Sequence, residues 1–590
     1  MSSSLLILLA LAQPFDWSAV GPERASVTAI AAGETMLAGT AQGRLFRAAP
    51  DGTWSAAGQL PPPIRAIAGG WVLAGHDLHR PEGDGWIRIS SGVEDFAVAP
   101  GAAYAATAAA ILASSDGGST WLSHPGGAVS IAIDAGDPRF VWAVRPDGSV
   151  EKSSDGGSTW TRSLEPAAAI RRVQAHPRRP RTAFAVADSG RGFRTTDGVA
   201  WSEIPFLAGT ITFHPHLEQS FYLVGDEGGL FRSDNDGEGA GIVHSGPILS
   251  LAIDARDGTL LAGFREEGIQ RSADGGETWV PHRQGLLAAE IHALAAAPDA
   301  GVVYAGSVST LFRTHDRGAS WEPVFTLRTL PGPWRAIAVD ETDPQRVWAG
   351  AGVSLWFSGD GGVRFNRLLW LPEREPETIR AVAVDAAERR AAWVLTSGGF
   401  FRLETEPLAL IELSPSSAAA GRFEALAVDP AEPRSIWIGG TRDDDALLLH
   451  SADGGRTWDD VTPRIRISGI SAPVTALHVD RRSGPAVLAG LASGRLLRSD
   501  DGGNIWRASD HRLAGAGPIA AIASDGTSLF VAANGVFVSG DGQSWRNAGG
   551  AIGHRPVTAL TSSEVVFAGT NGSGVFAQRA VRARRRAAGR

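Results

Sequence analysis

Four residues that could form a binding site recur at intervals of about 44 residues. They are His292, Arg335, Arg380 and Glu424. Two arginines beside a histidine can hold a carboxylate or a phosphate, because a guanidinium donates parallel hydrogen bonds to such groups. The same residues could instead form an Arg–Glu ion pair that plugs a channel and contributes little to stability. The sequence leaves both interpretations open.

A second set of residues is acidic. Asp226–Glu227 and Glu266–Glu267 stand in the equivalent segments "GDEGG" and "GFREEG", and Asp147 and Asp188 stand in the two such segments before them. Together these carboxylates could form an acidic cup for a cation, an amine or a sugar. Polar residues are also ordinary in tight turns, so solvated turns without a ligand are the alternative.

Both sets belong to a repeated unit. The octapeptide "SSDGGSTW" at Ser114–Trp121 returns unchanged at Ser153–Trp160. Each unit contains short apolar runs bounded by Gly, Asp and Pro, which predicts β-strands, named A to D in chain order. Strand A begins near Val27, Ile64, Val93, Val129, Ile170, Gly209, Ile248, Ile291, Trp334, Ile379, Phe423, Val474, Ile519 and Val557.

Four-stranded units of about 40 residues are typical of β-propeller blades. One ring of all these blades would exceed the usual range of about 4 to 8. We therefore predict an all-β chain with two tandem seven-bladed propellers, residues 23–285 and residues 286–580. Both candidate sets then lie on the face formed by the D–A and B–C loops, and the octapeptides lie on the other face.

The last predicted blade lacks strand D. Near the N-terminus, "PFDWSAVGPE" resembles an isolated strand D. An incomplete blade would leave a strand edge unpaired. We therefore predict that residues 13–22 close the second propeller, with residues near Trp17 pairing beside Val575–Phe576.

The octapeptide resembles the Asp-box, or BNR, repeat of sialidases, sortilin and related propellers. Its aspartate can accept hydrogen bonds from its own turn, its glycines allow positive φ, and its tryptophan packs on the neighbouring sheet. A motif repeated in most blades cannot serve one site, so we interpret it as structural. Its residues include Asp116 and Trp121, Asp155 and Trp160, Asp274 and Trp279, Asp316 and Trp321, Asp453 and Trp458, and Asp501 and Trp506.

Resemblances to Asp-box propellers point to two kinds of function. Tandem seven-bladed rings are similar to xyloglucan-cleaving glycoside hydrolases, but the first B–C loop, Ala38–Phe46, has no carboxylate where that resemblance implies a catalytic aspartate. A sialidase would need a tyrosine nucleophile, and Tyr104, Tyr222 and Tyr304 all lie inside predicted strands. Sortilin-like receptors and photosystem II assembly factors are similar propellers that act without catalysis.

We interpret the chain as a non-catalytic double propeller that binds a protein or a polysaccharide through its loop faces or the cleft between its rings. The alternative is a glycoside hydrolase acting on a β-glucan such as xyloglucan, for which the sequence identifies no catalytic pair. A net charge of −9 argues against nucleic acid as a partner. The absence of cysteine excludes disulfides and zinc–thiolate sites. We expect a monomer without a cofactor or a metal.

The ends of the chain carry separate signals. Leu5–Leu11 and the Ala10-Leu11-Ala12 pattern are typical of a signal peptide over residues 1–12. They predict a secreted or periplasmic protein, and a short apolar start that packs locally is the alternative. No later run reaches the ~18 apolar residues that a membrane helix needs. The arginine-rich residues 581–590 are expected to be a disordered tail.

Overall fold

The computed structural model describes residues 16–579 with short gaps at 34, 84, 166–167, 206–208, 227, 298–300, 328–331, 371–376, 386, 389–390, 406, 416–420, 466–471, 483, 510–512, 514 and 564. The predicted signal segment, the first residues of the predicted closing strand, Glu227 and the arginine-rich tail lie outside the described residues. The chain divides into two compact units. Residues 23–288 form the first, called ring 1, and residues 1–22 with 289–590 form the second, called ring 2.

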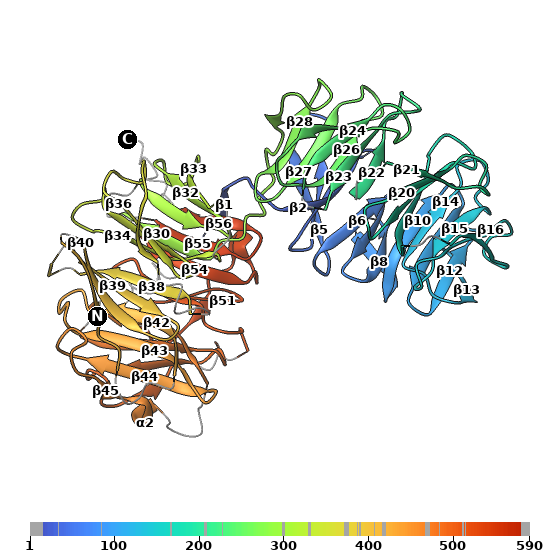
Figure 1. The fold of residues 1–590 in the computed structure, drawn as a ribbon. Coiled ribbons are helices and arrows are strands. Elements are labelled where there is room, and N and C mark those ends of the chain that lie inside the picture. The colour runs from blue at the N-terminus through green and yellow to red at the C-terminus, as the bar shows by residue number, and fades with distance from the viewer. Residues whose placement is uncertain are drawn as a thin grey trace, which may run out of the picture. The chain divides into compact units, whose positions relative to one another are not determined.

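The described chain forms fourteen antiparallel sheets of four strands each (Figure 1). In thirteen of them the four strands follow one another along the chain and pair in that order. Two short helical segments, α2 (Thr462–Ile465) and η4 (Gly550–Ile552), occur among the described residues. Within that same part of the chain, every helix falls short of the length and hydrophobicity that crossing a membrane requires.

Strand A of the sequence pattern is the inner strand of each sheet. In ring 1 the inner strands are β2 (Val27–Ala31), β6 (Ile64–Ala68), β10 (Val93–Ala99), β14 (Ser130–Ile133), β18 (Ile170–Ala175), β22 (Gly209–Phe213) and β26 (Ile248–Ile253). In ring 2 they are β30 (Ala293–Ala296), β34 (Trp334–Val339), β38 (Ile379–Val384), β42 (Arg422–Val428), β46 (Val474–Asp480), β50 (Ala521–Ser524) and β54 (Val557–Ser562).

The seven sheets of each unit close into a ring. Strand β2 contacts both β6 and β26, and strand β30 contacts both β34 and β54, so the first sheet packs against the last. Apolar side chains from neighbouring sheets form a separate cluster at most of these junctions, which is how a propeller distributes its core. The predicted all-β fold of two tandem seven-bladed propellers is confirmed.

One sheet of ring 2 is built from both ends of the chain. Its strand order is β1 (Asp16–Gly21), β56 (Gly574–Arg579), β55 (Val566–Thr570) and β54, and Figure 1 labels β1 beside β56. Trp17 pairs with Gln578, and Ala19 pairs with Phe576. The Trp17 side chain is 1% exposed and packs with Phe530 and Ile552. An N-terminal strand therefore completes the last blade.

The octapeptide turns are held by their own side chains. The Ser153 hydroxyl donates to Asp155 at 2.8 Å and accepts the Gly157 N–H at 2.8 Å. The Thr159 hydroxyl, the Thr159 N–H and the Ser153 hydroxyl, in that order of effect, lower the pKa of Asp155 to about 2. The turns at Asp116, Asp274, Asp316, Asp453 and Asp501 use the same contacts from a preceding Ser or Thr. The motif therefore satisfies the backbone of a tight reversal between the two outer strands.

Candidate functional site

A β-bulge places the second residue of most inner strands outside the pairing ladder. The register shifts across one residue near the start of ten of the fourteen inner strands, between the first and third residues in nine of them and between the second and fourth in β42. Such a bulge re-aims one side chain while the strand continues. The first residue stays buried, as Trp334 and Ile379 do at 0% exposure. Arg335, Arg380 and Glu424, which the sequence selected, are all bulged residues of this kind.

The bulged residues of neighbouring blades meet in ring 2. Arg380 Nη1 lies 3.4 Å from Glu424 Oε2. His292 Nε2 lies 3.4 Å from Glu290 Oε1, which belongs to the loop before β30. Arg335 acts electrostatically on both His292 and Arg380. We call Glu290, His292, Arg335, Arg380 and Glu424 the ring 2 mouth.

Several nitrogen donors of the ring 2 mouth have no hydrogen-bond partner among the described residues. Among the described residues, Arg335 makes no hydrogen bond or ion pair, and its pKa is lowered by burial and then by the charge of Arg380. The Nε atom of Arg380 is buried without a hydrogen-bond partner, and so is Nε2 of His292. Burial also lowers the pKa of His292, which favours the neutral ring at pH 7. Two guanidinium groups with free donors can bind one carboxylate, sulfate or phosphate.

The acidic residues of ring 1 have cationic neighbours. Asp226 is exposed and lies 2.6 Å from Arg171, the bulged residue of β18. Glu267 accepts the side-chain N–H of Gln270 at 2.7 Å. Glu266 and Glu267 are half-buried and act electrostatically on Arg24, whose pKa is lowered to about 10 mainly by burial. These carboxylates therefore have arginine neighbours, whereas Arg335 of the ring 2 mouth has no ion pair among the described residues.

Sequence reasoning missed a set of polar residues on the inner strands of ring 1. They occupy equivalent places on the inner strands, called the third position. Asp95, Arg172 and Ser250 stand where pairing resumes after the bulge, and Ser130 and Thr210 stand at the corresponding places of β14 and β22, which have no register shift. A cavity of about 850 Å³ runs along these strands and is lined by residues of all seven inner strands. Aligning the fourteen inner strands on their third residue would have revealed the set, because ring 2 has alanine at every one of these positions.

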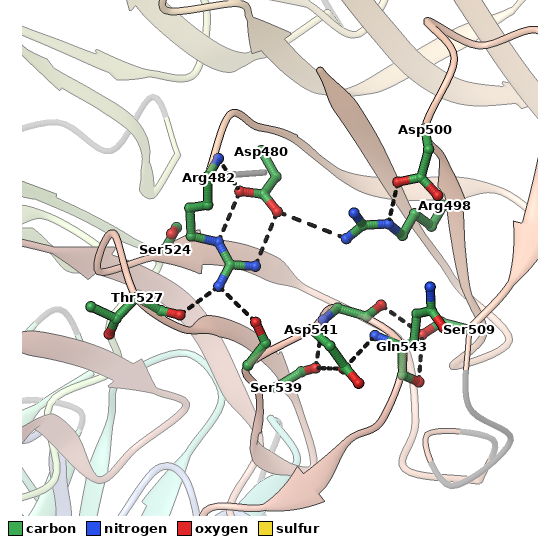
Figure 2. Close-up of polar contacts among 12 residues, drawn as sticks. Asp480, Arg482, Arg498, Asp500, Ser509, Ser524, Thr527, Ser539, Asp541 and Gln543 are labelled. Atoms are coloured by element: carbon green, nitrogen blue, oxygen red, sulfur yellow. Dashed lines mark hydrogen bonds and ion pairs between the residues drawn. The ribbon is translucent and has the colours of Figure 1, made fainter. Parts of the chain in front are cut away.

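A second group of charged side chains in ring 2 has mostly protein hydrogen-bond partners, unlike the ring 2 mouth. Arg482 donates to Asp480 at 2.9 and 3.0 Å and to the Thr527 carbonyl of the next blade at 2.7 Å (Figure 2). Arg498 Nε donates to Asp500 at 2.7 Å. Except for Nη1 of Arg498, these groups find protein acceptors. The network joins two blades and leaves little for a ligand to bind.

The three tyrosines are engaged in packing. Their hydroxyls donate to backbone carbonyls: Tyr104 to Pro138 at 3.1 Å, Tyr222 to Gly275 at 3.2 Å and Tyr304 to Gly361 at 2.8 Å. Burial raises the pKa of each. A buried tyrosine with a raised pKa is a poor nucleophile. Among the described residues no group of three or more His, Asp or Glu side chains could hold a metal ion.

Comparison with known proteins identifies the fold. No family model and no curated protein matches the sequence. An ancestral GH74 enzyme is similar in structure with a TM-score of 0.75 and 14% identity, over 96% of this chain and 99% of that one. A GH74 enzyme from Niastella koreensis gives 0.70 and 15% over the same shares of both chains. PorZ, a surface component of the type-IX secretion system of Porphyromonas gingivalis, gives 0.65 and 12% over 95% of this chain and 86% of that one.

Proposed function

We propose that this protein is a non-catalytic double propeller whose ring 2 mouth binds an acidic group of a protein or a polysaccharide. The carrying observation is Arg335, a guanidinium without a hydrogen bond or ion pair among the described residues, next to the unpaired Nε of Arg380. An unpaired cation beside a like charge is unfavourable in the free protein. A bound anion would relieve that repulsion and use the free donors.

The neighbouring groups support an anion more than a cation. Glu424 pairs with Arg380, Glu290 lies near His292, and both carboxylates attract Arg335 without pairing directly with it. Arg335 keeps all its donors available. The bulge holds these side chains on rigid inner strands, which favours precise positioning of a ligand. The fold is shared with PorZ as well as with GH74 enzymes, so it does not favour catalysis over binding.

Binding to acidic polymers tests this proposal. The purified chain is titrated with polygalacturonate and with poly-glutamate, and neutral xyloglucan is the uncharged comparison. We expect binding to at least one acidic polymer, weakened tenfold or more by Arg335→Gln with Arg380→Gln. Arg65→Gln is the matched control, because Arg65 is a bulged residue of ring 1 already 3.8 Å from Glu94. Equal binding by the double variant and the wild type would contradict the proposal.

The alternative function, a glycoside hydrolase, has a separate test. The chain is incubated with xyloglucan, other β-glucans and a sialoside reporter, and released reducing ends or reporter are measured. We expect no release above that of a heat-denatured sample. Release that needs the folded protein would identify the hydrolase and would direct attention to pairs of carboxylates about 5–10 Å apart.

A further inference from the structure

The channel of ring 1 contains a polar belt on one side and alanine on the other. Ala29 and Ala66 occupy the third position in the first two blades, and the next five blades carry Asp95, Ser130, Arg172, Thr210 and Ser250. The cavity of about 850 Å³ lies against these strands. That volume is within the range of about 300–1,000 Å³ usual for small-molecule sites.

Ring 2 shows that the fold does not require this belt. Its third residues are all alanine: Ala293, Ala336, Ala381, Ala425, Ala476, Ala521 and Ala559. Seven inner strands therefore close into a ring without any polar side chain at this position. The polar residues of ring 1 need a reason other than closure.

Three of the belt residues have structural contacts. Ser130 donates to Asp95 at 2.7 Å, and its oxygen accepts the Val173 N–H of the next blade at 3.3 Å. Ser250 donates to the Val27 carbonyl at 2.9 Å across the junction of the last and the first blade. Thr210 accepts a hydrogen bond from Arg172. These bonds give the three hydroxyl groups a structural role. They do not explain the charges of Asp95 and Arg172.

The two charges face the cavity without pairing directly. Asp95 accepts bonds from Ser130, the Ile131 N–H at 3.1 Å and the Phe96 N–H at 2.9 Å, which occupy three of its acceptor sites. Burial raises the pKa of Asp95, although these bonds and the charge of Arg172 favour the carboxylate. Arg172 is exposed to the cavity and uses one donor on Thr210. Among the ion pairs of the described residues, none joins Asp95 to Arg172.

We propose that the ring 1 channel binds a small zwitterion, with its ammonium group at Asp95 and its carboxylate at Arg172. A net-neutral ligand satisfies both charges without bringing net charge into the channel, and direct hydrogen bonds to charged groups are the strong ones. The apolar part of the ligand contacts the wall that includes Ile131, Ile211 and Leu251. A free amino acid or an ω-amino acid has this chemistry. This site is independent of the ring 2 mouth.

Titration calorimetry on the full chain tests the proposal with leucine and 6-aminohexanoate as probes. Hexanoate and hexylamine are the matched controls, because each has the alkyl chain and only one of the charges. We expect at least one zwitterion to bind ten times more tightly than either control. Ala66→Leu fills the cavity from the alanine side without touching a charge, and Arg172→Gln removes the guanidinium. Each should weaken binding at least tenfold, whereas Arg88→Gln, on the outer strand β9 (Gly85–Ser90) of ring 1, should not.

Several results would overturn the zwitterion site. They are no binding by either zwitterion, equal binding by hexanoate or hexylamine, and binding that Ala66→Leu and Arg172→Gln both leave unchanged. Circular dichroism melts of the two variants establish that they are folded. Thr210→Val supplies a further variant, because it frees Arg172 from its anchor while keeping both charges. It should weaken binding less than Arg172→Gln, and a loss as large would mean that the belt acts through structure alone.

Discussion

Ring 1 and ring 2 share one blade design but are completed in different ways. Every blade of ring 1 comes from one continuous segment, whereas the last blade of ring 2 takes its outer strand from the N-terminus. That strand begins Asp16-Trp17-Ser18-Ala19, and the ordinary outer strand β5 (Trp54–Gln59) of ring 1 begins after Thr53 with Trp54-Ser55-Ala56. The closing strand is therefore a normal outer strand displaced to the other end of the chain. Its partner is determined by the one blade that lacks such a strand.

The channels of the two rings differ in where their charges lie. In ring 2 the charged residues occupy the bulged second position, next to alanines at the third. In ring 1 the third position also carries charge, at Asp95 and Arg172. The second position can hold a charged residue or a threonine. The hydroxyls of Thr28, Thr475 and Thr558 donate hydrogen bonds from this position to the backbone carbonyl at the start of the next blade. Ring closure thus tolerates wide variation at these positions, which leaves them available for binding.

The largest expected effect comes from removing the closing strand. A chain that starts at Glu23 lacks β1, so β56 becomes an open edge and the cluster around Trp17 is lost. We expect ring 2 to unfold or to open widely while ring 1 keeps its structure. Hydrogen exchange resolved along the chain measures this, with faster exchange in 289–579 than in 23–288. Equal loosening of both rings would contradict the separate closure of each.

A matched pair of tryptophan variants tests whether the two rings are stabilised separately. Trp17 and Trp54 are 1% and 3% exposed and occupy equivalent places in β1 and β5. Truncation of either to alanine should cost about 3–5 kcal/mol. We expect Trp17→Ala to loosen ring 2 alone and Trp54→Ala to loosen ring 1 alone, as measured by denaturant unfolding with ring-resolved hydrogen exchange. If each variant loosened both rings, the two units would unfold as one.

Acid should affect ring 2 through a histidine on an inner strand. Burial, more than the charges of Asp480 and Arg482, sets the pKa of His478, which is lowered to about 4. An unfolded histidine titrates near pH 6.5, so below that pH the unfolded chain binds a proton that the folded chain does not yet bind. The free energy of unfolding therefore falls as the pH drops from about 6.5 to about 4, by up to about 3 kcal/mol. His478→Gln should flatten the pH dependence of unfolding in this window. Ring 1 has no titratable residue at the equivalent position, where Gln174 stands.

The fold could be predicted from the sequence because each blade is specified locally. Apolar runs end at Asp-Pro, Gly and Asp-box turns, so the predicted starts near Ile64, Val474 and Val557 coincide with β6, β46 and β54. The site could be predicted only in part. The bulged position was found, but whether Arg335 or Arg380 pairs with Glu424 depends on distances between separate blades. Asp95 was missed because one polar residue in a short strand looks like ordinary alternation.

The smallest expected effect is that of Arg335→Gln on stability. Arg335 makes no hydrogen bond or ion pair among the described residues, and the charge that acts on it most strongly is the like charge of Arg380, ahead of the attraction of Glu424 and Glu290. Its removal should change the free energy of unfolding by less than about 0.5 kcal/mol. Arg65→Gln, which removes the exposed ion pair with Glu94, should cost up to about 1 kcal/mol. Denaturant unfolding of the two variants, measured at low and high salt, separates the cases, because only the loss at Arg65 should shrink as salt screens the pair. A larger loss at Arg335 than at Arg65 would mean that the ring 2 mouth is held together by Arg335, and the site would then be structural.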